Sequence, residues 1–278
     1  MKKILLVVVI IIFITLLLPL AIVWLIGGSG EGQSPIESGT VSVYVSEEDC
    51  VKDMDINEYL KCVVAAEMPA DFEEEALKAQ AVAARTYLYS HIAEKDKGNI
   101  AESHNGAVIC TDSTHCQAYI SEDKRRESWG AGADENWNKI STAVDETTGQ
   151  IMTYNDEIIS AVFHSSGMTE SAVDVWGADV PYLQSVASTG DEESPKYHSE
   201  LTLSEQEFKN IAEEKIDGVD WNNGLVSNIN RSNAGGIVTL DVGGVNIKGT
   251  EFRNIFSLRS ANVEISQENG NIKMSVKG

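Results

Sequence analysis

Glu67 is the residue whose type and position most suggest acid–base chemistry. It lies in a stretch, 57–92, whose pattern predicts two helices separated by Pro69. Leu60, Val64 and Glu67 follow one another at helical spacing, so Glu67 lies on the apolar face that should meet the core. Apolar surroundings and the negative end of a helix both favour the neutral acid, which a general acid requires. The alternative is a helix-end carboxylate turned toward solvent.

A second group of reactive side chains lies in the segment 104–116. His104, Cys110, His115 and Cys116 offer the two nitrogen and two sulfur ligands that suit a tetrahedral zinc site. Their spacing is not that of a standard zinc finger. The alternative is a disulfide between Cys110 and Cys116, which an extracytoplasmic location permits. A zinc ion closed by four protein ligands would be structural rather than catalytic.

The elements that must position these residues are both helical and extended. Acidic residues open the second helix of the 57–92 pair, and an apolar stripe runs along it through Leu77, Ala81, Ala84, Leu88 and Ile92. Further helices are predicted at 136–146, 204–211 and 250–256, and strands at 150–154, 157–163, 225–230, 237–242, 245–248, 262–266 and 272–276. We therefore expect an α+β fold in which the helical pair packs on mostly antiparallel strands.

The N-terminal region is set apart by its hydrophobicity. After two lysines, residues 4–26 form an apolar run long enough to cross a hydrocarbon core of about 30 Å. The run lacks a small-residue cleavage site and exceeds the roughly 7 to 15 apolar residues of a signal peptide. It predicts a cytoplasmic tip and transmembrane anchor at 1–27, a flexible linker at 28–40 and an extracytoplasmic domain at 41–278. The expected location is the cell membrane, with a single span.

The formal net charge of −22 excludes a nucleic-acid-binding role, and no basic run offsets it. The acidic residues are spread over loops and helix starts, as on a soluble surface. Two further cysteines lie near Glu67 in the sequence. We expect Cys62 to be buried, and Cys50 either to pair with it or to stay free.

Two sets of short runs form longer signatures. They lie in the helical pair and after the hairpin that the predicted strands 150–154 and 157–163 would form. The runs are EMP at 67–69, EALKAQA at 75–81, AARTY at 83–87, HSSGMTE at 164–170, DVWG at 174–177 and VPYLQSV at 180–186. Together they resemble the signatures of the stage II sporulation protein D (SpoIID/LytB) family. The turn after the histidine and serine is shorter than is usual in that family, and we expect the C-terminal end to be truncated relative to it.

The resemblance implies roles for particular residues. Glu67 matches the family's catalytic glutamate, and some members resemble metal binders in the 104–116 loop. His164 and Ser165 invite comparison with a nucleophilic hydrolase, but nothing near them supplies the remaining groups of a triad. We expect them to bind glycan hydroxyls or to hold Glu67, unless they are structural. Arg85, Tyr87 and Tyr182 could also bind substrate in a sugar cleft, and core packing is the alternative for each.

The resemblance also implies an activity. Members of the family are membrane-anchored lytic transglycosylases that cleave peptidoglycan glycan strands during engulfment in sporulation. One carboxylate suffices because the muramic acid C6 hydroxyl attacks the anomeric carbon and gives a 1,6-anhydro product, whereas ordinary glycosidases need two carboxylates. The implied partners are a peptidoglycan amidase and another membrane protein. The alternatives are a non-catalytic wall-binding scaffold and a zinc-dependent wall hydrolase, which would need an open metal position.

Overall fold

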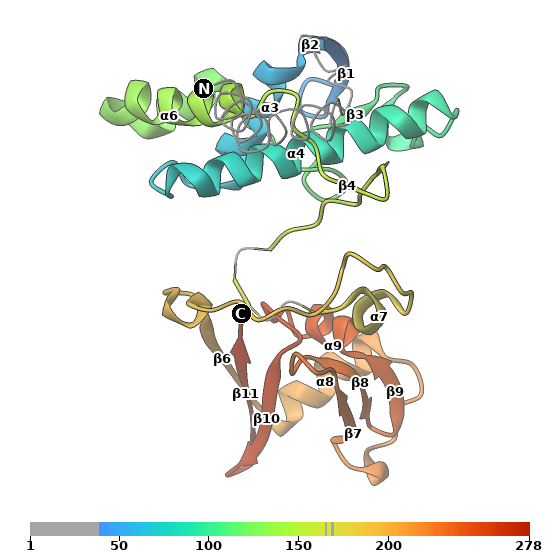
Figure 1. Ribbon diagram of the computed structural model, residues 1–278. Helices are drawn as coiled ribbons and strands as arrows, with labels where there is room; N and C mark the ends of the chain where they lie inside the picture. The colour runs from blue at the N-terminus through green and yellow to red at the C-terminus, as the bar shows by residue number, and fades with distance from the viewer. Residues whose placement is uncertain (1–38, 165, 168–169) are drawn as a thin grey trace, which may run out of the picture. The chain divides into compact units, whose positions relative to one another are not determined.

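The computed structural model describes residues 39–164, 166–167 and 170–278 (Figure 1). The chain divides into two compact units, the first ending at Val162 and the second spanning Phe163–Gly278, so the predicted 41–278 domain contains residues of both. The predicted anchor and nearly all of the predicted linker lie outside the described residues. Within the described ranges, no helix is both long enough and apolar enough to cross a membrane.

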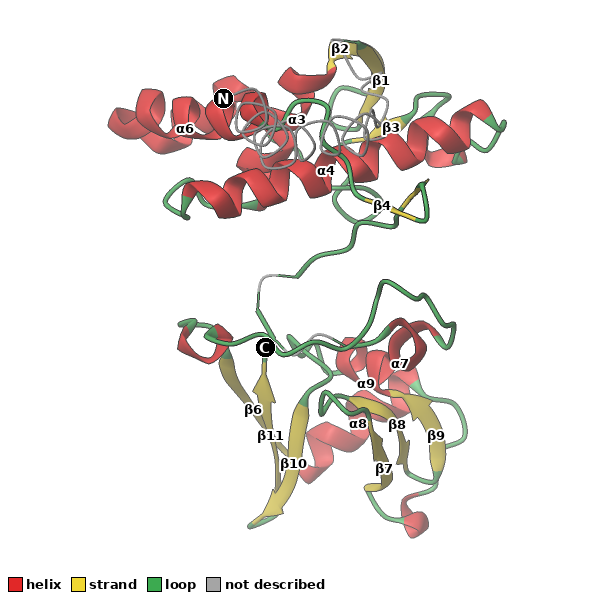
Figure 2. Cartoon of the chain, in the orientation of Figure 1, coloured by secondary structure: helices red, strands yellow, loops and turns green. Residues whose placement is uncertain are grey.

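The helices of the first unit are α3 (Ile56–Glu67), α4 (Glu74–Asp96), α5 (Glu122–Trp129) and α6 (Ala133–Glu146), with short 3-10 turns at Glu102–His104 and Gly130–Gly132 (Figure 2). The side chain of Asp55 caps α3 by accepting the N–H groups of Asn57 and Glu58. The helix ends at Glu67 because Met68, which precedes a proline, is extended. Acidic residues occupy the first turn of α4, as the sequence predicts.

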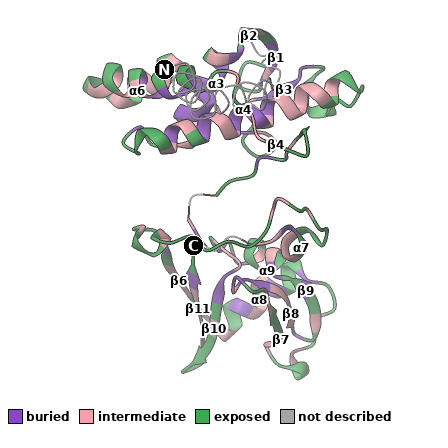
Figure 3. Cartoon of the chain, in the orientation of Figure 1, coloured by how far each residue is buried: buried purple, intermediate pink, exposed green. Residues whose placement is uncertain are grey.

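The core of the first unit lies between these helices. Figure 3 shows the buried residues concentrated on α3 and along one side of α4. The predicted apolar stripe is confirmed, since four of its members are fully buried and Ile92 packs against the same cluster: Leu77, Ala81, Ala84 and Leu88. Trp137, Ile140 and Val144 of α6 complete this core.

The strands of the first unit are β1 (Thr40–Val45), β2 (Cys50–Asp55), β3 (Ile109–Cys110), β4 (Thr153–Tyr154) and β5 (Glu157–Ile158). β1 pairs with β2 in antiparallel fashion and with β3 in parallel fashion. β4 and β5 form a hairpin at the predicted place, but each strand has two residues, so the predicted strands at 150–154 and 157–163 were too long. The turn residues Asn155 and Asp156 have φ of 51° and 65°. Positive φ at both central residues is the geometry of a type I′ turn.

The second unit contains two antiparallel three-stranded sheets. One has the order β10 (Val263–Glu268), β11 (Asn271–Lys277), β6 (His198–Ser204), and the other β7 (Val226–Arg231), β8 (Ile237–Val242), β9 (Val245–Lys248). Its helices are α7 (Ala172–Trp176), α8 (Glu205–Lys215) and α9 (Gly249–Ile255), with 3-10 turns at Asp191–Glu193 and Trp221–Asn223. Phe208 of α8 stacks on Phe256 at 4.7 Å between ring centroids.

The predicted α+β class is therefore confirmed, and α8 begins at a capping box formed by Ser204 and Glu207. Strands β1, β2, β3 and β6 and helices α5 and α7 were not predicted from the sequence. No residue of α5 is buried, so its sequence carries no apolar periodicity from which a helix could be recognised.

Candidate functional site

Glu67 is the last residue of α3, and its side chain is half-buried. Its Oε1 accepts a hydrogen bond of 2.7 Å from the main-chain N–H of Ala118. The segment that carries Ala118 runs beside α3, since the N–H of Ile120 also bonds to the carbonyl of Cys62 at 3.4 Å. One carboxylate oxygen is therefore held by the backbone. No hydrogen bond to the other oxygen occurs among the described residues, which leaves it available for proton transfer.

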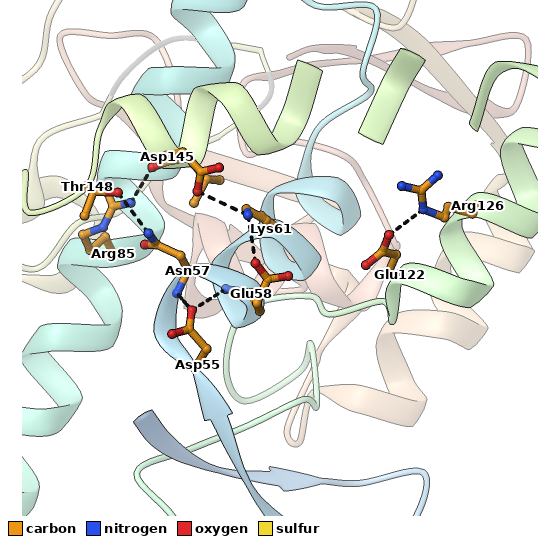
Figure 4. A network of polar contacts seen from close by, with 10 residues as sticks. Asp55, Asn57, Glu58, Lys61, Arg85, Glu122, Arg126, Asp145 and Thr148 are labelled. Carbon is orange, nitrogen blue, oxygen red and sulfur yellow. Dashed lines mark hydrogen bonds and ion pairs between the residues drawn. The ribbon is translucent and has the colours of Figure 1, made fainter. Parts of the chain in front are cut away.

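The N-terminal half of α3 is tied to α6 by polar contacts, seen in Figure 4. Lys61 Nζ lies 2.8 Å from Glu58 Oε1 and 3.2 Å from Asp145 Oδ1, and its side chain is only 11% exposed. Asn57 Nδ2 donates to Thr148 Oγ1 at 2.9 Å, just past the end of α6. α3 is thus fixed to α6 at this end, and Glu67 at its other end is held by the segment that carries Ala118.

The four predicted metal ligands converge. One ligand atom from each of His104, Cys110, His115 and Cys116 lies within 4.8 Å of the other three. His104 Nε2 is 3.1 Å from His115 Nδ1 and 3.2 Å from Cys116 Sγ. His115 Nδ1 is 3.4 Å from Cys116 Sγ and 3.6 Å from Cys110 Sγ. The cysteines are free thiols, so the alternative Cys110 to Cys116 disulfide is not formed here.

These separations match the edges of a tetrahedral zinc site. Zinc bonds of 2.0–2.1 Å to nitrogen and 2.3 Å to sulfur give edges of about 3.3 Å between two nitrogens and about 3.6 Å between nitrogen and sulfur. Burial, and after it the neighbouring His115, lowers the pKa of His104, so its ring favours the neutral form that binds metals. Burial raises the pKa of the Cys116 thiol to about 11. A thiolate at this position would therefore need a bound cation to stabilise it.

Local structure holds the cluster in place. β3 supplies Cys110 beside β1, and the 3-10 turn Glu102–His104 supplies His104. Asp112 shapes the turn that carries the other two ligands, since its main-chain oxygen accepts from the N–H groups of His115 at 3.1 Å and of Cys116 at 2.7 Å. Ala118 follows two residues later, so one short segment carries both the cluster and the hydrogen-bond donor to Glu67.

Arg85, predicted to contact substrate, is fully buried. Its Nη1 donates to the carbonyl of Thr147 at 2.6 Å, and its Nη2 to the carbonyl of Val144 at 2.9 Å. These are main-chain carbonyls at the C-terminus of α6, where Val144 O also accepts from the hydroxyl of Thr147 at 3.1 Å and Thr147 O from the N–H of Gln150 at 3.0 Å. Arg85 thus holds a helix end and presents no surface to a substrate in this structure.

The other predicted substrate-binding residues that the structure describes are divided between the two units. Tyr87 is half-buried in the first unit, where its ring lies 4.3 Å from that of His91, and burial followed by the neighbouring Cys116 raises the pKa of its hydroxyl. His164 is exposed and Tyr182 half-buried, and both belong to the second unit. Ser165 lies outside the described residues. A role for these residues around Glu67 stays a prediction.

Ala118 was not recognised from the sequence, because its contribution is a main-chain N–H. Such a donor has no signature in side-chain type. The signal that could have suggested it is its place two residues after a predicted metal ligand, where the backbone is held fixed.

The site therefore combines a carboxylate fixed at a helix end with a cluster of two histidines and two cysteines, in a unit of mixed helices and strands. Residues 44–154 match the family model described as Stage II sporulation protein. The chain is 34% identical over 248 residues to stage II sporulation protein D of Bacillus amyloliquefaciens, covering 88% of this chain and 69% of that protein. It is 33% identical over 255 residues to stage II sporulation protein D of Bacillus subtilis, covering 90% and 72%.

The chain therefore belongs to the stage II sporulation protein D family, a family of sporulation proteins. Part of it is also similar to a protein with another name. Over 151 residues it is 36% identical to the amidase enhancer of Bacillus subtilis. The aligned residues make up 54% of this chain and 17% of that protein.

Proposed function

We propose that this protein is a lytic transglycosylase that cleaves the glycan strands of peptidoglycan during engulfment in sporulation. The observation that carries the proposal is the half-buried Glu67 at the end of α3, with Oε1 held by the N–H of Ala118. General acid–base catalysis needs a carboxyl group held in a fixed direction with one oxygen available to the reacting groups. Membership of the family supports the same role for Glu67, since this residue matches the catalytic glutamate that the resemblance implies.

In the proposed reaction Glu67 acts twice. The protonated carboxyl first donates its proton to the glycosidic oxygen, and the bond between that oxygen and the muramic acid anomeric carbon breaks. The resulting carboxylate then takes the proton of the C6 hydroxyl, whose oxygen forms the new bond to the anomeric carbon. The products are a 1,6-anhydro end and a strand with a free hydroxyl, and Glu67 regains its proton. The hydrogen bond from Ala118 keeps Oε1 occupied, so Oε2 is the oxygen that transfers protons.

The proposal includes one zinc ion held by His104, Cys110, His115 and Cys116. Four protein ligands complete a tetrahedral shell, so this zinc would stabilise the loop and leave no position for a substrate. That arrangement does not support the alternative of a zinc-dependent wall hydrolase. The part played by zinc would be to fix the segment that leads to Ala118.

The proposed location is the cell membrane, with the apolar run at 4–26 as a single span and both compact units outside the cytoplasm. The proposed partners are a peptidoglycan amidase and a further membrane protein. The similarity to a protein named amidase enhancer supports the amidase. The same similarity favours one second candidate function, a wall-binding scaffold that assists an amidase without cleaving glycan.

The test is a digest of purified glycan strands, stripped of their stem peptides, with the full-length protein in detergent. Mass spectrometry of the products should show 1,6-anhydro ends that increase with time. A zinc-dependent hydrolase would instead give reducing ends, and a scaffold would give no new ends. Either of those results would overturn the transglycosylase proposal.

A further inference from the structure

The second unit contains a small pocket outside the site described above. It has a volume of about 140 Å³ and lies among α7, β8 and the junction of β9 with α9. Its walls are largely apolar, with Val173, Val175, Ile237 and Val238 among the lining residues. A small, mostly apolar hollow with a few polar groups is the usual form of a binding site for part of a small molecule.

The polar group of interest in this pocket is the carboxylate of Glu170. Its Oε1 accepts the main-chain N–H of Gly236 at 3.0 Å. Its Oε2 is buried and has no hydrogen-bond partner among the described residues. Since leaving a buried charged acceptor unsatisfied is costly, a donor from outside the protein should favour this position. The second acid of the pocket, Asp174, already accepts the hydroxyl of Ser171 at 2.7 Å.

The position of Glu170 depends on a glycine. A Cβ atom built on Gly236 would lie 2.2 Å from Glu170 Oε1, so only a residue without a side chain lets the carboxylate reach the main-chain N–H. The pocket therefore has a carboxylate that is held in one orientation by Gly236, the residue just before β8. Lys248, at the end of β9, lines the same pocket and supplies a cationic donor.

These groups match a secondary amide better than an amine. An ammonium group brings three N–H donors, whereas the pocket offers one unpaired carboxylate oxygen and otherwise largely apolar walls. An acetamido group brings one N–H for Glu170, one carbonyl oxygen that can accept from Lys248, and a methyl group for the valine and isoleucine side chains. Its neutrality also suits a pocket that already contains a lysine.

We propose that this pocket binds the acetamido group of an N-acetylated amino sugar. The choice of a sugar rests on the proposed function, because peptidoglycan strands are built from N-acetylated sugars. The second unit then contributes a recognition subsite for the N-acetyl group, and Glu170 is its specificity-determining residue.

The experiment is a titration of the full-length protein, in detergent, with N-acetylglucosamine, followed by NMR at the amide of Gly236. A monosaccharide has no glycosidic bond, so the measurement is independent of cleavage. Saturable shifts at Gly236 are expected with N-acetylglucosamine and not with glucosamine. Saturation by glucosamine, or shifts with neither sugar, would overturn the proposal.

Two variants test the residues. Glu170→Gln keeps the shape and the bond to Gly236 but places an N–H donor where the amide N–H must bind, so affinity should fall at least tenfold. Gly236→Ala should push the carboxylate aside and have a similar effect, monitored at Val238. Glu268→Gln, an exposed acid of β10, is the matched control and should bind like the wild type. Unchanged affinity in both test variants would contradict the assignment.

The two proposals fail separately. If the protein releases 1,6-anhydro ends but N-acetylglucosamine leaves Gly236 unshifted, the transglycosylase proposal stands and the subsite is wrong. If the sugar binds at Gly236 and no ends are released, the subsite stands and the scaffold function is favoured.

Discussion

The main-chain N–H of Ala118 lies 2.7 Å from Oε1 of Glu67, although 51 residues separate them in the sequence. Ala118 comes two residues after Cys116, a member of the His–Cys cluster. The residue proposed for catalysis and the cluster proposed for zinc are therefore joined by a single short segment. A change in the His–Cys cluster should therefore shift this N–H and with it the Glu67 carboxylate, and a change at Glu67 should likewise affect the cluster.

Replacement of Glu67 by glutamine should abolish most of the cleavage without unfolding the protein. The glutamine oxygen can still accept from Ala118, but the amide can neither release nor take up the catalytic proton. Formation of 1,6-anhydro ends should fall by at least the roughly 10²-fold to 10⁴-fold that general acid–base catalysis contributes. Product release from glycan strands, measured by mass spectrometry, checks this.

The matched control for that change is Glu73→Gln. Glu73 is an exposed acid at the start of α4, on the other side of Pro69, and no ion pair to it occurs in the described structure. Its variant should keep nearly full activity. Wild-type rates from Glu67→Gln would remove the proposed role of Glu67 and favour a scaffold.

Removal of metal should destabilise the first unit. Because a structural zinc binds the folded state, its binding free energy adds to the free energy of unfolding. Metal analysis should find one zinc per chain, and a strong chelator should lower the unfolding temperature. Cys116→Ser should lose both the metal and the response to chelator, whereas Cys50→Ser, outside the cluster, should keep both. A metal-free protein with a Cys110 to Cys116 bridge would replace zinc with the disulfide.

Arg85 should prove to be a stability residue. Arg85→Leu removes two hydrogen bonds from a charged donor, to the carbonyls of Thr147 and Val144, at about 1.5–3 kcal/mol for each. The midpoint of urea unfolding should therefore drop by the equivalent of roughly 3 kcal/mol. Unchanged stability together with weaker glycan binding would instead support the substrate-binding role that the sequence analysis assigned to it.

The parts of the site that were predicted from sequence depend on short-range rules. Pro69 prevents the helix from continuing, which places Glu67 in the last turn of α3. The four metal ligands were recognised because they fall within one loop and have the right chemistry. The hairpin turn at Asn155 and Asp156 follows from the ease with which such residues adopt positive φ.

The parts that were missed depend on long-range contacts. Ala118 acts through its backbone, so its residue type indicates nothing. Arg85 is buried because its acceptors are carbonyls about sixty residues away, and a sequence pattern does not show which helix end an arginine will reach. β3 is two residues long and is defined only by its parallel pairing with β1. Propensity over so short a stretch predicts no strand.

The apolar run at 4–26 is predicted to remain attached and to leave both compact units outside the cytoplasm. Protease added to intact protoplasts should degrade the part of the chain after the linker, because the lysines at the start should stay on the cytoplasmic side. A cytoplasmic marker protein must remain intact in the same sample. Full protection of the chain, or a mature N-terminus near Gly30, would exclude the anchor.

The last prediction concerns the reactivity of Cys62, which is buried in α3 as the sequence analysis expected. Burial raises the pKa of its thiol to about 11, and the thiolate is the form that reacts with alkylating reagents. At pH 8 only about one thiol in a thousand is then ionised, and the alkylation rate of the native protein should rise about tenfold per pH unit up to a pH of about 11.

The same shift links Cys62 to stability. The unfolded thiol loses its proton near pH 8.5, whereas the folded thiol keeps it until about pH 11, so the unfolded state binds fewer protons between these values. Stability from this group is complete below about pH 8.5 and falls as the pH rises toward 11. Mass spectrometry after alkylation at pH 8, with and without urea, should show Cys62 modified only in the unfolded protein. Rapid modification of Cys62 in the native protein at pH 8 would contradict its burial and the raised pKa together.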